Sequence, residues 1–80
     1  MKMAIIEDMP DEIAGNVWNV QVHGPGLDGC WIVQGPFYGN VPDEDEIVPS
    51  CIVEDRDAAL TVAAELAAET AVIYADPDPS

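Results

Sequence analysis

The fold of this 80-residue chain is decided by residues 16–34, which read NVWNVQVH, GPGLDG and CWIVQ in three consecutive blocks. Apolar and polar residues alternate through the first block, Asn16 to His23. That alternation is typical of a half-buried β-strand. One face carries Trp18, Val20 and Val22, and the other carries Val17, Asn19, Gln21 and His23.

The other two blocks extend this strand into a hairpin. Gly24 to Gly29 is rich in residues that tolerate turn dihedrals. Cys30 to Gln34 resumes the strand pattern, with Trp31 and Val33 opposite Cys30 and Ile32. We therefore expect an antiparallel hairpin with a longer loop.

On the N-terminal side, Met3 to Ile6 is a short apolar run that forms an edge strand or covers the core. Asp8 to Gly15 has an early proline, acids near its start and a closing glycine, which indicates a single helical turn. On the C-terminal side, Gly35 to Glu46 has the composition of a connecting loop.

The rest of the chain adds a strand, a helix and a last strand. Pro49 interrupts the apolar run from Ile47 to Val53, which predicts a bulge or an edge strand. Asp55 is suited to cap a helix over Ala58 to Glu69, and Ala71 to Tyr74 is the last strand. The helix face expected to meet the sheet is formed by Ala59, Val62, Ala63, Leu66 and Ala67.

This order of elements predicts an α+β fold: a small antiparallel sheet of three to four strands with one main helix on one face. Residues 1–75 form one domain, and residues 76–80 form a disordered acidic tail.

Charge restricts the possible partners. Sixteen acidic residues face two basic ones, Lys2 and Arg56, which gives a formal net charge of −14. Binding to nucleic acid or to an anionic membrane requires clustered Lys and Arg. We therefore expect neither as a direct partner, and we expect a cation or a cationic partner to stabilise the fold.

The chain also lacks the signals of membrane insertion or export. No apolar run reaches the length of a membrane span, and acids follow Lys2 where a secretory signal would be apolar. We expect a cytoplasmic protein. Cys30 and Cys51 lie in apolar strand-like runs and are expected to be small buried hydrophobes, with a disulfide as the alternative.

No residue pattern indicates an enzyme or a cofactor. His23 has no Ser or Cys at a spacing that suggests a nucleophile. The glycine-rich block at 24–29 lacks the Lys and the helix start that hold a phosphate. Asp43 to Glu46 offers oxygen ligands to a hard cation but not the spacing of an EF-hand, so we expect no specific metal site.

The remaining candidates are the acids themselves, and two interpretations stay open. They form a solvated surface of the kind that halophilic proteins carry, or they imitate the DNA backbone and occupy a cationic groove of a nucleic-acid-binding protein. Trp31, Phe37 and Tyr38, if exposed, would anchor such a contact. The expected contact residues are Asp43, Glu44, Asp45, Glu46, Glu54, Asp55, Asp57, Glu65 and Glu69.

Spacing tests the imitation of DNA. Along a helix, Asp57 and Glu65 are about 12 Å apart, and Glu65 and Glu69 about 6 Å. Phosphates of one DNA strand recur about every 3.4 Å along the axis. The acids of the helix alone are too widely spaced to imitate the phosphates, so the Asp43 to Glu46 run or the N-terminal acids must contribute to the contact.

In length, Lys-poor acidic surface and sheet-plus-helix order, the chain resembles the small acidic anti-CRISPR proteins encoded by phages, in particular the type I inhibitors and, among them, subtype I-C. The order that carries the resemblance ends with the segment from Asp55 through Tyr74. The family shares no motif, so the resemblance carries over no residue. It implies an inhibitor in the host bacterial cytoplasm that binds a subunit of the CRISPR surveillance complex (Cascade) and keeps target DNA out of its basic channel.

Overall fold

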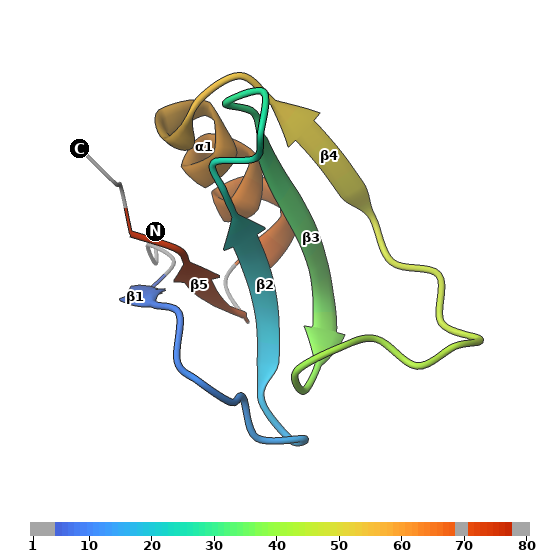
Figure 1. Cartoon of the computed structure of the whole chain (residues 1–80). Coiled ribbons are helices and arrows are strands. Elements are labelled where there is room, and N and C mark those ends of the chain that lie inside the picture. Colours follow the sequence, from blue (N-terminus) through green and yellow to red (C-terminus); the bar gives the residue numbers. More distant parts are fainter. Residues whose placement is uncertain (1–4, 69–70, 78–80) are drawn as a thin grey trace.

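The computed structural model describes residues 5–68 and 71–77, and it shows a five-stranded sheet with one helix packed against one face (Figure 1). The elements in chain order are β1 (Ile5–Asp8), β2 (Trp18–His23), β3 (Trp31–Tyr38), β4 (Ser50–Val53), α1 (Arg56–Ala67) and β5 (Val72–Ala75). The α+β class predicted from the sequence is confirmed. No helix in the described ranges has the length and apolarity needed to cross a bilayer.

The sheet is mixed, with strand order β1-β5-β2-β3-β4. The predicted hairpin is confirmed, because β2 pairs antiparallel with β3, and β4 pairs antiparallel with β3 in turn. Strand β5, however, is parallel to both of its neighbours, β1 and β2. The prediction of an antiparallel sheet of three to four strands is therefore wrong in number and in direction.

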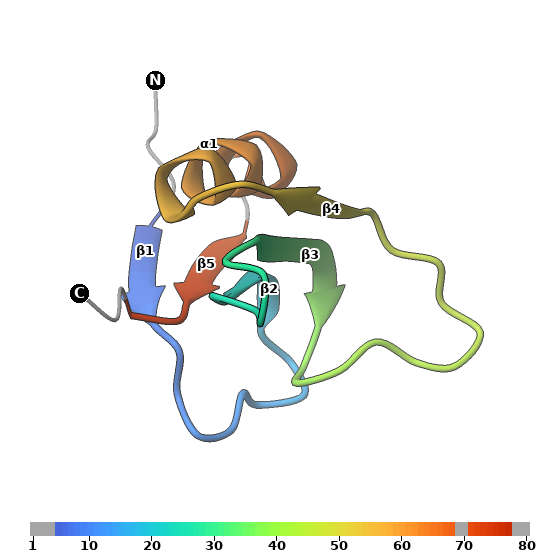
Figure 2. The same cartoon turned by 45° about the horizontal axis from the view of Figure 1, so that its top comes forward.

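Helix α1 explains the parallel pairing. It follows β4 at one edge and crosses the face of the sheet over β3 and β2 (Figure 2). A helical crossover returns the chain in the same direction, so the strand after it runs parallel to the strand before it. The crossover ends inside the sheet, where β5 is inserted between the edge strand β1 and the central strand β2.

The core lies between α1 and the sheet. Ala59, Ala63 and Ala67 are buried on the helix, as their spacing predicts. Their small side chains allow the helix to approach the strands closely. The buried residues packed with them are Val20, Val22, Trp31, Val33, Ile73 and Ala75 of the sheet and Ala71, just before β5.

The start of α1 is also as expected. Asp55 is the N-cap, and its Oδ1 accepts a hydrogen bond of 2.7 Å from the backbone N–H of Ala58. The helix begins at Arg56, two residues before the predicted start, and ends at Ala67. The predicted last residue, Glu69, lies outside the described residues.

Strand β2 is buried on both faces, which corrects the half-buried strand that its alternation predicts. Val20 and Val22 belong to the core under α1. Asn19 and Gln21 point to the opposite face and are buried as well, with 0% and 4% of their surface exposed. Their amide nitrogens donate to backbone carbonyls, as buried polar groups require, and three of these carbonyls belong to Phe37, Gly39 and Asn40, far along the chain. The Oδ1 atom of Asn19 is buried without a hydrogen-bond partner among the described residues.

Strand β3 continues to Tyr38, so the connecting loop predicted from Gly35 is wrong in its first part. Asn19 pairs with Phe37 and Gln21 with Gln34, which leaves one extra residue on β3. This β-bulge contains Gly35, whose φ is 137° and whose added Cβ would lie 2.9 Å from the Cα of Val20. Gly-Pro marks a bulge here, although it is also a common loop signal.

Residues 9–17 join β1 to β2 without a helix, so the helical turn predicted for Asp8 to Gly15 is wrong. Because β1 and β2 are both parallel to β5, this segment must return along the whole length of β2. Six strand residues span about 20 Å, whereas nine helical residues would cover only about 13 Å. The segment passes on the side of the sheet opposite α1 (Figure 2).

The two edges of the sheet are β1 and β4. For the N-terminal run, the edge-strand alternative applies to Ile5 and Ile6, while Met3 lies outside the described residues. The edge position predicted for the segment after Pro49 is confirmed, but Ile47 and Val48 precede the strand.

The chain end departs from the predicted tail at its first residue. The backbone N–H of Asp76 donates to the carbonyl of Val22 at 2.9 Å, and its Oδ2 accepts from the N–H of Gly24 at 3.2 Å. Asp76 therefore extends the pairing of β5 with the end of β2. Residues 78–80 of the tail lie outside the described residues.

Candidate functional site: an acidic groove

The loop between β3 and β4, residues 39–49, extends away from the sheet and forms one wall of an open groove (Figure 1). The groove has a volume of about 870 Å³. Glu12, Ile13 and Gly15 of the segment before β2 line the other wall. Two segments more than twenty residues apart therefore share one concave surface.

Buried amides of β2 hold the base of this loop. The Nδ2 group of Asn19 donates to the carbonyl oxygens of Val17 and Gly39, both at 2.9 Å, and of Phe37 at 3.2 Å. The Nε2 group of Gln21 donates to the carbonyl of Asn40 at 2.8 Å. The loop therefore leaves the sheet at a fixed point. Sequence analysis places both side chains on a polar strand face and misses this role.

Close packing of glycines brings the two walls together. Gly39 has a φ of 83°, and a Cβ built on it would lie 3.3 Å from the Cα of Gly15. The backbone N–H of Gly39 also donates to the carbonyl of Val17 at 3.1 Å. A larger residue at position 39 would be strained and would push the walls apart.

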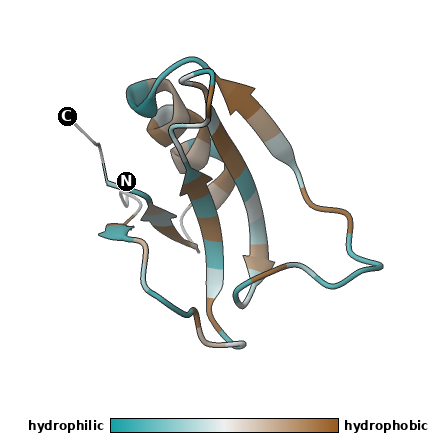
Figure 3. Ribbon diagram, viewed as in Figure 1, coloured by the Kyte–Doolittle hydropathy of each residue, from teal (hydrophilic) through white to brown (hydrophobic). Residues whose placement is uncertain are grey.

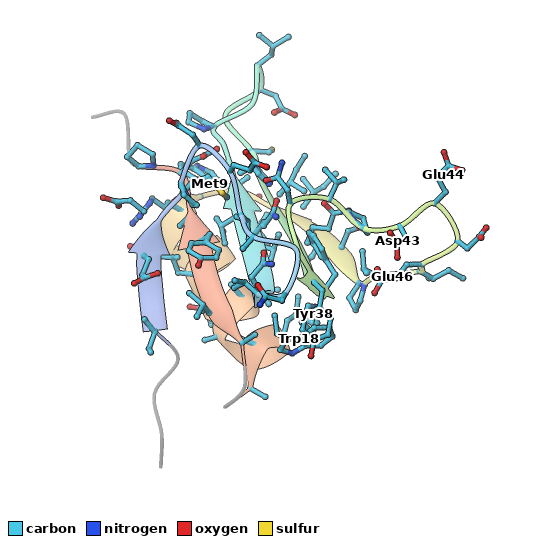
Figure 4. All side chains as sticks on the ribbon, turned by 90° about the horizontal axis from the view of Figure 1, so that it is seen from below. Met9, Trp18, Tyr38, Asp43, Glu44 and Glu46 are labelled. Atoms are coloured by element: carbon cyan, nitrogen blue, oxygen red, sulfur yellow. The ribbon has the colours of Figure 1, made fainter. Side chains whose placement is uncertain are left out.

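The walls of the groove are strongly acidic. Asp43, Glu44, Asp45 and Glu46 are all exposed on the loop, and Glu12 is exposed on the opposite wall. The N–H of Glu46 donates to the carbonyl of Asp43 at 2.9 Å, so the run folds into a turn that gathers its carboxylates. Figure 4 shows Asp43, Glu44 and Glu46 on the part of the loop that extends farthest from the sheet.

No described cation neutralises these acids. Arg56 is the only Lys or Arg within residues 5–68 and 71–77, and it lies at the start of α1, beyond the opposite end of β4. Its Nε donates to the carbonyl oxygen of Asp76 at 3.2 Å. The groove therefore presents an uncompensated negative field to any partner.

The predicted contact residues fall into separate places. The Asp43 to Glu46 run precedes β4, whereas Glu54, Asp55 and Asp57 follow it at the start of α1, and Glu65 is exposed farther along the helix. The strand separates the first two groups, and the carboxylate of Asp55 is committed to capping the helix. Glu69 lies outside the described residues. The groove instead adds Glu12, one of the N-terminal acids that the sequence suggests as contributors but that the expected contact residues leave out.

Of the three predicted aromatic anchors, one is exposed and two are buried. Trp31 and Phe37 are buried, with 4% and 0% of their surface exposed. Trp31 belongs to the core under α1, and Phe37 is paired with the buried Asn19 of β2. Tyr38 is 59% exposed and lines the groove. Its ring packs against Trp18 with centroids 4.7 Å apart and planes tilted by 50° (Figure 4).

His23 lies outside the groove, at the end of β2. Its Nε2 is 2.8 Å from the Oε1 of Gln21, and its Nδ1 is 3.6 Å from the Oδ2 of Asp76. These contacts fix the ring between two polar side chains. They connect the end of β2 to the end of β5.

The cysteines depart from the buried positions expected of them. Cys51 is exposed and Cys30 is half-buried, and both are free thiols. Asp28 accepts a hydrogen bond from the N–H of Cys30 at 3.1 Å, which holds the pKa of Asp28 below its usual value. Desolvation, followed by the nearby charge of Asp28, raises the pKa of the Cys30 thiol.

Within the described part of the chain, no three His, Cys, Asp or Glu side chains come together as metal ligands. No family model, curated protein or solved structure matches this chain.

Proposed function

We propose that this protein binds a cationic, nucleic-acid-binding surface of another protein and keeps nucleic acid away from it. The acidic groove carries the proposal. It combines five exposed carboxylates, Glu12 and Asp43 to Glu46, with one exposed aromatic side chain, Tyr38. Opposite fields speed the encounter and orient the partners, and a partly buried aromatic ring supplies affinity.

The density of the acids supports imitation of a phosphate backbone. The run places four carboxylates on consecutive residues, and its turn gathers them into one strongly negative cluster, comparable in charge density to the phosphates of one DNA strand, which recur about every 3.4 Å along the axis. The run Asp43 to Glu46 therefore has the density that the helix lacks, since its exposed acids Asp57 and Glu65 are eight residues apart. The groove, rather than the helix, is the proposed contact.

In its narrower form, the proposal is that the partner is a type I CRISPR surveillance complex and that the protein is an anti-CRISPR inhibitor. This form rests on the family resemblance stated above. The alternative is an acidic halophilic or phage domain with another binding or structural role. The acids outside the groove favour that alternative, because Glu7, Asp8, Glu54 and Glu65 are also exposed.

The test is target-DNA binding by a purified type I surveillance complex with increasing amounts of this protein. We expect DNA binding to fall as the protein is added. A variant that neutralises the run should lose this effect: Asp43→Asn, Glu44→Gln, Asp45→Asn and Glu46→Gln. A control variant removes the same charge elsewhere and should inhibit as the natural protein does: Glu7→Gln, Asp8→Asn, Asp28→Asn and Glu65→Gln.

Two outcomes would contradict the proposal at different levels. Unchanged DNA binding at saturating protein rejects inhibition of this complex. Inhibition that survives neutralisation of the loop but is lost in the control variant assigns the contact to another face of the molecule.

A further inference from the structure

The outer edge of β4 is an open sheet edge without the usual protection. Strand β4 is the last in the sheet, and its residues Ser50–Val53 carry no charge and no proline. Natural edge strands are commonly protected from pairing by charged side chains, proline or bulges. The other edge, β1, has such protection from Glu7 and Asp8.

The backbone groups on this edge follow from the register. The N–H of Gly35 donates to the carbonyl of Pro49, so these two residues form a hydrogen-bonded pair of the β3–β4 ladder. In an antiparallel ladder, hydrogen-bonded pairs alternate with pairs whose backbone groups point away. The N–H and C=O groups of Ser50 and Ile52 therefore point outward, where no strand of the described chain pairs with them.

Exposed apolar side chains accompany these backbone groups. Ile52 lies opposite Ile32, and the two are 70% and 45% exposed on the sheet face away from α1. Ile47, just before the strand, is 98% exposed. Figure 3 shows this apolar stretch beside the hydrophilic part of the loop. An added strand would cover these side chains while its backbone pairs with β4.

The charges at the two ends of β4 define what such a strand must carry. Asp43 to Glu46 precede the strand, and Glu54, Asp55 and Asp57 follow it. A second copy of this chain, with its own net charge of −14, would bring like charges to both ends. A segment with Lys or Arg at each end would bring opposite charges.

We propose that the outer edge of β4 takes up an extended segment of the partner protein as an additional strand. The segment has apolar residues at alternate positions, over Ile32 and Ile52, and Lys or Arg at both ends. Pairing of this kind derives affinity from main-chain hydrogen bonds and specificity from alternate side chains. The proposal rests on the proposed function for the positive charge of the partner, and it specifies how that partner is held.

The probe is the synthetic peptide Lys-Lys-Thr-Val-Thr-Val-Thr-Lys-Lys, with a control peptide of the same sequence whose five central residues are N-methylated. Both peptides carry the same charge, but the control has no central N–H groups to donate. Amide hydrogen exchange of the full chain is measured by NMR with and without each peptide. We expect the unmodified peptide alone to slow exchange at Ser50 and Ile52.

Two variants of this chain test the edge from its own side. Ile52→Pro removes an outward N–H group that β3 does not use, and it should weaken binding of the peptide at least about fivefold through the lost hydrogen bond. Ile52→Thr keeps the N–H group and should bind more tightly than Ile52→Pro. Circular dichroism checks that each variant is folded, and the N-methylated peptide gives the same test without any change to the chain.

The outcomes separate this inference from the proposed function. Equal binding of the two peptides, or no slowing at Ser50 and Ile52, overturns strand pairing and leaves the acidic groove as a purely electrostatic contact. Loss of peptide binding in Ile52→Pro, with full binding after neutralisation of Asp43 to Glu46, supports main-chain pairing at the edge but overturns the Lys or Arg assigned to that end of the segment. Slow exchange at both amides in the protein alone, together with a dimeric mass in solution, assigns the edge to a second copy and overturns the proposed occupant.

Discussion

At the scale of single residues, Asp55 shows how one acidic side chain has a structural task that its neighbours lack. Its carboxylate caps α1 through Ala58, whereas the adjacent Glu54 is exposed. Asp55 belongs to the acids that the sequence suggests as partner contacts. Neutralising it would disturb the helix as well as the surface charge, so it is a poor probe of binding.

We predict that Asp55→Ala lowers the free energy of unfolding by about 1 kcal/mol, because the first turn of α1 loses its cap. Glu54→Gln should change it by less than about 0.5 kcal/mol, as is usual for exposed sites. Urea unfolding followed by the fluorescence of Trp18 and Trp31 measures both. Equal stability of the two variants would contradict the assigned role of the cap.

Among individual side chains, Asn19 connects most directly to the candidate site. Its amide group binds carbonyls on both sides of the β2–β3 pair, including that of Gly39 at the base of the acidic loop. The side chain is completely buried. Its effect therefore belongs to the scale of the elements that it joins.

At that scale, we predict that Asn19→Ala lowers the free energy of unfolding by about 2 to 4 kcal/mol, because buried carbonyls lose their donors. Asn40→Ala is the control, because Asn40 is exposed and accepts from Gln21 only through its backbone carbonyl. Urea unfolding compares the two. Hydrogen exchange at Gly39 should increase in Asn19→Ala alone, and unchanged exchange would show that the amide does not fix the loop.

Elements whose character depends on local pattern could be predicted from the sequence. Alternation identifies β2 and the first half of β3, and the Asp55 cap with the alanine spacing identifies α1. Features that depend on strand order could not be predicted from the sequence. The insertion of β5 between β1 and β2 makes the sheet mixed and sets the path of residues 9–17.

The same distinction applies to the candidate site. The Asp43 to Glu46 run and its position in a loop could be predicted, because both are local features. The approach of Glu12 to that loop could not be predicted, because it depends on how residues 9–17 return to β2. The burial of Trp31 and Phe37 also depends on tertiary packing, because aromatic residues in a β-pattern are equally compatible with exposed and core positions.

At the scale of the whole molecule, the acids outside the groove make the fold sensitive to salt. Carboxylates lie on the β1 edge, on residues 9–17, on the loop and on α1, while Arg56 is the only Lys or Arg in the described ranges. Their mutual repulsion opposes folding, and salt screens it. This repulsion is present in a DNA mimic and in a halophilic domain alike. The two differ in whether the fold is stable at low salt, where the repulsion is strongest.

We predict that the protein is folded at about 0.02 M NaCl and gains on the order of 1 kcal/mol of stability at about 0.5 M, as the Debye length falls from about 20 Å to about 4 Å. Circular dichroism and urea unfolding at each concentration measure this gain. The variant with Asp43 to Glu46 neutralised should gain less, because fewer charges repel one another. Binding to the cationic partner should weaken over the same range, since salt screens that attraction too. Loss of the circular dichroism signal in dilute buffer, with recovery only at molar salt, would favour the halophilic alternative, because the acids would then require bulk cations rather than one positively charged partner.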